Sequence, residues 1–186
     1  VNTLEPQVTW GTSPQHVAPV NSSVPAPEEA GDGPSRANAK AALAYQQLTP
    51  GTALESVRTD VAYIGTCTNA RLSDLGRAAE FLRGRRVASH VTAICVPGAA
   101  GVKRAAEAEG LDAVFREAGF EWHDAGCGMC GSGRGRLEDV RVISTSNRNF
   151  ENRQGKRTRT HLASPLTVAA SAVAGHIADP RKEVLA

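Results

Sequence analysis

From Thr59 onward, short apolar runs alternate with segments of helical periodicity, and this alternation constrains the fold more than any other feature. The apolar, strand-like runs occur at 60–65, 90–98, 120–126 and 140–147. Helical patterns cover 70–84, 100–110, 111–119 and 164–177, the last with Ser164 as N-cap and Pro165 in its first turn. Strands separated by helices of this length form parallel sheets covered on both faces. The sequence therefore predicts an α/β fold, a three-layer αβα domain with a mostly parallel sheet.

The first residues have a different texture. Residues 1–28 are rich in proline and show no long apolar period, so we expect an extended N-terminal arm with a strand at most near 7–10. An alanine-rich helix is predicted over 33–48. The domain organisation expected is an arm over 1–28 followed by an α/β domain over 29–186.

Composition narrows the classes of function. The chain has 186 residues, a net charge of +2 and four cysteines. So small a charge does not favour a nucleic-acid partner, and no apolar run approaches the ~18 residues of a membrane span. No charged segment followed by an apolar one opens the sequence, so we expect no secretion signal. The cysteines therefore favour metal or redox chemistry in a cytoplasmic protein over disulfide bonds.

Three of those cysteines follow predicted strands. Cys67 comes directly after the first strand, and Cys127 and Cys130 form a CxxC motif in the glycine-rich stretch GCGMCGSGRG after the third. In open parallel sheets, ligands bind beyond the carboxyl ends of the strands. The three thiols can therefore converge at one edge of the sheet although they are far apart in sequence.

Three kinds of site fit these cysteines. Cys127 and Cys130 could form a dithiol redox pair, although no thioredoxin-like order of elements surrounds them. His123 could complete a Cys₃His zinc site. The third kind is an iron–sulfur cluster, in which three thiolates leave one iron without a protein ligand, and the neighbouring glycines let the backbone approach the sulfides. Cys95 lies inside an apolar run and is expected to be buried.

A loop rich in amides and guanidinium groups follows the fourth strand. Within TSNRNFENRQG, it offers Asn147, Arg148, Asn149 and Arg153. Planar guanidinium groups bind carboxylates in a bidentate manner. Because this loop is predicted at the same edge as the thiols, it indicates a site for an anionic, carboxylate-bearing substrate. The basic stretch GKRTRTH that follows is interpreted as a charged loop at an interface rather than a nucleic-acid patch.

These motifs together carry a resemblance that extends over nearly the whole chain. The stretches concerned are PQVTWGTSP, GTCTNAR, PGAAGVKRAAEAEGL, FREAGFEWHDAGCGMC, STSNRNFENRQG and RTHLASP. They resemble the C-terminal part of the large subunits of the 3-isopropylmalate dehydratases, within the aconitase superfamily. The resemblance implies that Cys67, Cys127 and Cys130 are ligands of a [4Fe–4S] cluster. It also implies that Asn147, Arg148 and Arg153 contact the substrate.

The same resemblance implies an activity. Members of this family isomerise 2-isopropylmalate to 3-isopropylmalate by dehydration and rehydration in leucine biosynthesis, with the open iron as Lewis acid. Their large subunits are much longer, and a small, swivelling-domain subunit supplies a catalytic serine. We therefore identify no catalytic residue in this chain. We expect further N-terminal domains and a small subunit as partners, and an isolated chain without activity.

Two departures from the family pattern keep alternatives open. The family usually has a leucine- and methionine-containing turn where this chain has GSGRGRLEDV, and commonly a glycine at Asn152. Both lie beside the predicted site, so one alternative is a related hydro-lyase acting on another hydroxy di- or tricarboxylic acid. The other is a non-catalytic iron–sulfur protein. His161 adjoins the stretch TSNRNFENRQG at 145–155, called the arginine loop below, and a structural role is favoured for it.

Overall fold

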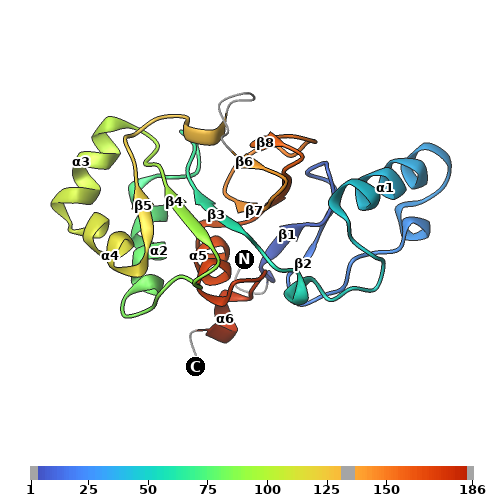
Figure 1. Cartoon of the computed structure of the whole chain (residues 1–186), viewed down its shortest axis with the longest axis horizontal. Coiled ribbons are helices and arrows are strands. Elements are labelled where there is room, and N and C mark those ends of the chain that lie inside the picture. Colours follow the sequence, from blue (N-terminus) through green and yellow to red (C-terminus); the bar gives the residue numbers. More distant parts are fainter. Residues whose placement is uncertain (1–3, 131–136, 184–186) are drawn as a thin grey trace.

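The computed structural model describes residues 4–130 and 137–183, which contain a central five-stranded sheet (Figure 1). In spatial order its strands are β5 (Phe120–Trp122), β4 (Thr92–Cys95), β3 (Val61–Ile64), β7 (Arg141–Ser144) and β9 (Arg159–Leu162). All neighbouring strands in this sheet pair in parallel. The predicted α/β class with a parallel sheet is confirmed.

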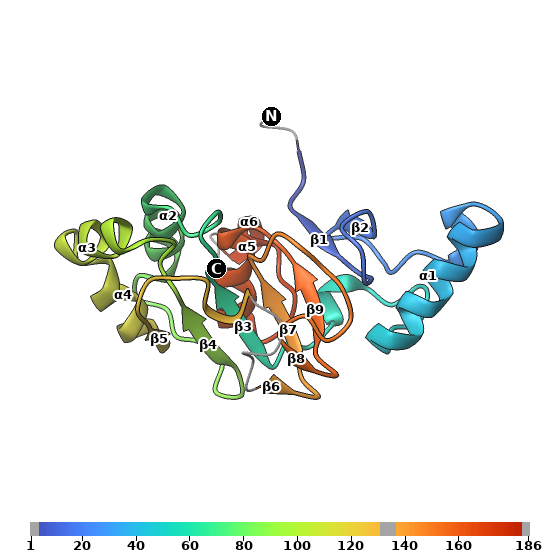
Figure 2. The same ribbon diagram turned by 90° about the horizontal axis from the view of Figure 1, so that it is seen from above.

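Helices cover one face of this sheet. They are α2 (Leu72–Leu82), α3 (Ala100–Ala108), α4 (Leu111–Ala118) and α5 (Pro165–Ala174), followed by the short α6 (Pro180–Glu183). Figure 2 shows α2, α3 and α5 on the same side of the strands. Ala62, Ile64 and Ile143 point into the apolar core on that side. At the start of α5, Ser164 accepts a hydrogen bond from the Thr167 amide, which confirms the predicted N-cap.

The opposite face carries a second, smaller apolar cluster. Val61, Tyr63, Val96 and Val142 form it, and Met129 and Leu137 are among the residues packed against it. Met129 belongs to the 3₁₀ helix η3 (Gly128–Cys130), and Leu137 belongs to β6 (Leu137–Glu138). Among the described residues, η3 and β6 cover this cluster, not the second helical layer that the three-layer prediction implies.

The N-terminal arm packs at the β9 edge of the sheet. Its strand β1 (Gln7–Thr9) pairs antiparallel with β2 (Val17–Pro19), and the 3₁₀ helix η1 (Pro27–Ala30) leads into α1 (Gly33–Gln46). The hydroxyl of Thr9 accepts a hydrogen bond of 2.7 Å from the Leu162 amide. The strand expected near 7–10 and the helix expected over 33–48 are confirmed. In Figure 1, α1 lies at the end of the molecule opposite to α3 and α4.

The sequence missed the fifth strand of the sheet. The interpretation of GKRTRTH as a charged loop was wrong: β8 (Gly155–Lys156) pairs with β6, and β9 is the edge strand beside β7. Its polar residues are accommodated because Thr160 and His161 are buried and hydrogen-bonded, while Arg159 reaches the Asp139 carboxylate at 2.8 Å.

Within the described residues, none of the helices has the length and apolarity that a membrane span needs.

Candidate functional site

The loops that follow β3 and β7 are joined by hydrogen bonds at the carboxyl edge of the sheet. Thr145, directly after β7, donates its hydroxyl to the Gly65 carbonyl at 2.8 Å and accepts the Gly65 amide at 2.8 Å. The side-chain amide of Asn69 donates to the Thr145 carbonyl at 2.7 Å. The loop that carries Cys67 and the loop that carries Arg148 are therefore fixed to each other at their bases.

The CxxC loop joins the same edge from β5. The Gly126 amide donates to the Pro97 carbonyl at 3.1 Å, which connects this loop with the one after β4. The phenol of Tyr63 donates to the Cys127 carbonyl at 3.3 Å and accepts the Met129 amide at 3.2 Å. The loops after β3, β4, β5 and β7 consequently form one connected surface, as the strand order predicted.

Two of the three predicted cluster ligands present exposed thiols on this surface. Cys67 and Cys127 are both exposed, whereas Cys95 is fully buried and its burial raises the pKa of its thiol. The backbone of Cys130 ends η3, but its side chain lies outside the described residues. Among the side chains that are described, no three His, Cys, Asp or Glu residues gather around a common point. A three-thiolate site at this edge would therefore require Cys130.

His123 is exposed and contacts a carboxylate. Its Nε2 lies 2.9 Å from the carboxylate of Glu121, two residues before it on the same exposed stretch. The contact gives the imidazole a partner other than a metal ion. The structure therefore provides no support for the Cys₃His alternative.

The predicted substrate residues of the arginine loop differ in how exposed they are. Asn147 and Arg148 are exposed, on the loop that Thr145 joins to the loop of Cys67. Arg153 is only 4% exposed, and its guanidinium carbon lies 5.1 Å from the centroid of the Phe150 ring. Asn149 is buried and donates to the Thr9 hydroxyl at 3.0 Å and the Gly11 carbonyl at 2.6 Å, so its amide anchors the loop to the arm.

The departure at Asn152 has a conformational explanation. Its φ of 61° places it in the left-handed region, which glycine and asparagine adopt more readily than other residues. Its side-chain carbonyl accepts the Arg157 amide at 2.6 Å, and its own amide donates to the Tyr45 hydroxyl at 2.7 Å. Asparagine at this position can therefore keep the turn that a glycine would make.

His161 lies in the interior and does not line the site. It is fully buried between β7 and the arm, with its Nδ1 2.7 Å from the Thr9 carbonyl and its Nε2 2.8 Å from a guanidinium nitrogen of Arg141. Arg141 also donates to the Gln46 carbonyl at 2.7 Å. The structural role favoured for His161 agrees with these contacts.

The sequence did not point to the residues that connect the loops. Tyr63, Asn69 and Thr145 make the hydrogen bonds described above, yet none of them was predicted to bind a ligand or to act in catalysis. The available signal was positional: Thr145 follows a strand directly, and Tyr63 is a polar aromatic residue in an otherwise apolar run. Only their tertiary neighbours show what they hold.

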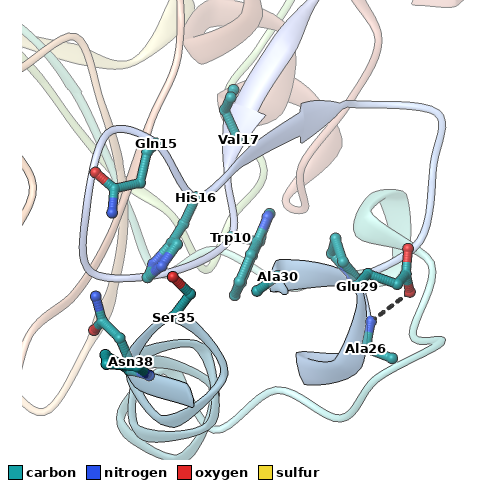
Figure 3. A pocket seen from close by; sticks show the side chains of 11 residues that line it. Trp10, Gln15, His16, Val17, Ala26, Glu29, Ala30, Ser35 and Asn38 are labelled. Atoms are coloured by element: carbon teal, nitrogen blue, oxygen red, sulfur yellow. Dashed lines mark hydrogen bonds between the residues drawn. The ribbon is translucent and has the colours of Figure 1, made fainter. Parts of the chain in front are cut away.

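A separate cavity of about 520 Å³ lies between the arm and α1 (Figure 3). The rings of Trp10 and His16 stack there with centroids 4.5 Å apart, and Glu29 accepts the Ala26 amide at 2.7 Å. Among the residues whose side chains are described, none of the cysteines and none of the predicted substrate residues lines this cavity. The connected loops at the sheet edge, where the chemically distinctive side chains lie, are therefore the candidate site.

Comparison with known proteins identifies the family of the chain. The chain matches the sequence model of the Aconitase family (aconitate hydratase) over residues 1–175. The chain belongs to the aconitase family. It is 59% identical over 181 residues to the 3-isopropylmalate dehydratase large subunit of Cupriavidus necator, a match that covers 96% of this chain and 68% of that protein. Both names denote hydro-lyases, so the predicted enzyme class is confirmed at the level of the family.

Proposed function

We propose that this chain is the cluster-binding and substrate-binding part of a hydro-lyase of the 3-isopropylmalate dehydratase type. The reaction would be the isomerisation of 2-isopropylmalate to 3-isopropylmalate by dehydration and rehydration, a step of leucine biosynthesis. One observation carries the proposal: the exposed Cys67, Cys127 and Arg148 lie on loops that follow parallel strands at one sheet edge, and the loops that carry Cys67 and Arg148 are hydrogen-bonded to each other. A cytoplasmic location belongs to the same proposal, because thiolates persist in a reducing compartment.

The donor chemistry supports an iron–sulfur cluster as the group held here. Cys67 and Cys127 would bind it together with Cys130, and thiolates are the usual protein ligands of such clusters. When bound, a [4Fe–4S] cluster with three thiolate ligands supplies one iron without a protein ligand, a Lewis acid for the substrate hydroxyl. Gly126 lies beside the first CxxC cysteine and leaves space near the thiols, with no atom within 4 Å of the position that its Cβ would take.

The arginine loop would hold the substrate carboxylates. The exposed guanidinium of Arg148 can bind a carboxylate through two parallel hydrogen bonds, and the neighbouring amide of Asn147 can donate to the same group. Arg153, whose side chain is almost fully buried, would contribute a second positive charge to the loop. Because Asn149 fixes this loop to the arm and Thr145 fixes it to the loop after β3, the carboxylate would be held in one orientation, with the bonds to be broken aligned.

The groups that transfer protons belong, in this proposal, to other parts of the assembly. Dehydration needs a base for the carbon-bound proton, an acid for the departing hydroxyl and exclusion of bulk water. The small subunit and further domains of the large subunit would supply them. The match covers 68% of the Cupriavidus necator protein, so part of that relative lies outside the compared region.

A reconstitution experiment tests the proposal. The chain is loaded anaerobically with iron and sulfide, and alkene formation from 2-isopropylmalate is followed by absorbance. We expect about four irons per chain, no turnover by the chain alone, and turnover after addition of the small subunit and the N-terminal domains. Turnover by the isolated chain, proportional to its concentration, would contradict the composite site. Iron binding without turnover in the full assembly would favour a non-catalytic iron–sulfur protein.

Replacing Arg148 by lysine tests the role of the arginine loop. Lysine keeps the charge but loses the planar pair of donors, so kcat/KM of the assembled enzyme should fall at least about tenfold, or about 1.4 kcal/mol. Cluster content should not change. Arg157→Lys is the matched control, because Arg157 lies on the same segment but pairs with Glu138 and Asp139. Unchanged kcat/KM in both variants would show that Arg148 is only a solvated surface residue.

A further inference from the structure

We infer that Tyr63 is a positioning residue for the CxxC loop, and that its phenol and the missing side chain of Gly128 form a matched pair. This inference rests on the proposed function, because it concerns how the loop holds Cys127 in the geometry that a cluster needs. Tyr63 belongs to the central strand β3, four residues before Cys67. The loop it contacts lies far away in the sequence.

The hydroxyl of Tyr63 makes one hydrogen bond on each side of Gly128. It donates to the carbonyl of Cys127 at 3.3 Å and accepts the amide of Met129 at 3.2 Å. These two backbone groups flank the residue between them, so the phenol spans the first turn of η3 like a clamp. The conformation of the peptide that carries Cys127 is thereby connected to β3.

The space around the phenol depends on the absence of a side chain at Gly128. A Cβ built there would overlap the Tyr63 hydroxyl and would lie 3.2 Å from the ring carbon that bears it and 3.0 Å from a Val96 methyl. Gly65 closes the other side, since a Cβ there would also overlap the Tyr63 ring. Gly128 further has a φ of 50°, which L-residues rarely adopt. The glycine inside the CxxC motif is thus required by Tyr63 as well as by the backbone.

The position of the hydroxyl is set by rigid surroundings. Tyr63 is fully buried, its strand is paired on both sides, and its ring belongs to the apolar cluster with Val61, Val96 and Val142. Phenylalanine would keep this packing and lose only the two hydrogen bonds. The hydroxyl is therefore not needed for packing of the core. It fixes the distance between the CxxC loop and the strand that leads to Cys67.

The consequence is a preorganised relation between the two cysteine loops. Thr145 fixes the base of the Cys67 loop through Gly65, and Tyr63 fixes the CxxC loop through Cys127 and Met129. Side chains held in place before binding lose less freedom when the ligand arrives. Removal of the phenol hydroxyl should consequently loosen the CxxC loop in the metal-free protein and make the bound cluster easier to lose.

The test uses the full chain and the variants Tyr63→Phe, Gly128→Ala and their combination. Met129 is the only methionine of the sequence, so selective ¹⁵N-methionine labelling reports on the amide that bonds to Tyr63. In metal-free Tyr63→Phe, we expect exchange of this amide to be about three- to tenfold faster, the range for one lost hydrogen bond. Tyr45→Phe is the matched control, since its hydroxyl bonds to Asn152 and Thr158 instead.

The pairing of Tyr63 with Gly128 is tested by a double-mutant cycle in thermal unfolding. Gly128→Ala should lower Tm more in the wild-type background than in Tyr63→Phe, because the hydroxyl that its methyl group would overlap is absent from the latter. In the reconstituted chain, Tyr63→Phe should release iron to a chelator about three- to tenfold faster and change the visible circular dichroism of the cluster, whereas Tyr45→Phe should do neither.

The outcomes separate this inference from the proposed function. If the unmodified chain does not take up about four irons, the proposed function fails and so does the role of Tyr63 toward a cluster. If the chain binds its cluster, but Met129 exchange and iron release are unchanged in Tyr63→Phe and the Tm losses are additive, Tyr63 is an ordinary core residue. Faster exchange, faster iron release and non-additive Tm losses together support the clamp.

Discussion

Replacing Cys67 by serine is expected to abolish cluster binding. Serine preserves the size of the side chain, but its hydroxyl does not give up a proton near neutral pH as a metal-bound thiol does. Cys127→Ser and Cys130→Ser should have the same effect. Iron content after anaerobic reconstitution should fall from about four per chain to less than about one, with loss of the brown absorbance.

Cys95→Ser is the matched control for this series. Cys95 is fully buried in β4, and burial raises the pKa of its thiol, so it does not offer a thiolate. We expect this variant to keep its iron, although a hydroxyl in the core will cost some stability. Loss of iron in Cys95→Ser together with retention in Cys67→Ser would refute the ligand assignment, whatever the state of the other variants.

The parts of the structure that followed from the sequence are those in which local pattern and tertiary environment agree. The apolar runs around Tyr63 and Ile143 became central strands because buried parallel strands require continuous apolar residues. Ser164 became an N-cap because its hydroxyl satisfies an amide of the first turn. The position of the cysteine loops at one edge of the sheet followed from the parallel strands, since the carboxyl ends of parallel strands share one edge.

The parts that could not be predicted depend on partners distant in sequence. The strand β9 contains Arg159, Thr160 and His161, and such residues are rarely found in a sheet unless other elements satisfy them. Here Asp139 pairs with Arg159, Gln154 accepts from Thr160, and the arm accepts from His161. For the same reason Tyr63 and Thr145 were not singled out: their hydroxyls bond to backbone atoms of loops that only the fold brings near.

Acid is expected to destabilise this protein through His161. The carbonyl of Thr9 can only accept a hydrogen bond, so the Nδ1 of His161 must carry the proton. The guanidinium of Arg141 can only donate, so Nε2 must be unprotonated. A second proton would break the bond to Arg141 and place two cations in contact within the core.

These contacts explain the direction of the pKa shift. Burial, and then the positive charge of Arg141, lower the pKa of His161 from its usual 6.5 to about 3. Burial likewise lowers the pKa of Arg141 to about 10. The unfolded chain therefore binds one proton more than the folded chain between pH 6.5 and about 3. The contribution of His161 to stability is complete above pH 6.5 and declines as the pH falls toward the folded pKa.

The expected size of the effect is about 2 kcal/mol between pH 6.5 and 4.5, a range that lies above the usual pKa values of most carboxylates. Urea unfolding of the metal-free chain at several pH values measures it. His161→Gln, whose amide can still donate and accept, should be less stable at pH 7. Its unfolding free energy should depend less on pH, by a slope that corresponds to about one proton taken up on unfolding. Burial also lowers the pKa of His16, so a smaller slope of the same sign should remain. His123→Gln, which replaces an exposed imidazole, is the matched control. An unchanged slope in His161→Gln would show that the buried imidazole accepts a proton at little cost, which its contact with Arg141 should not permit.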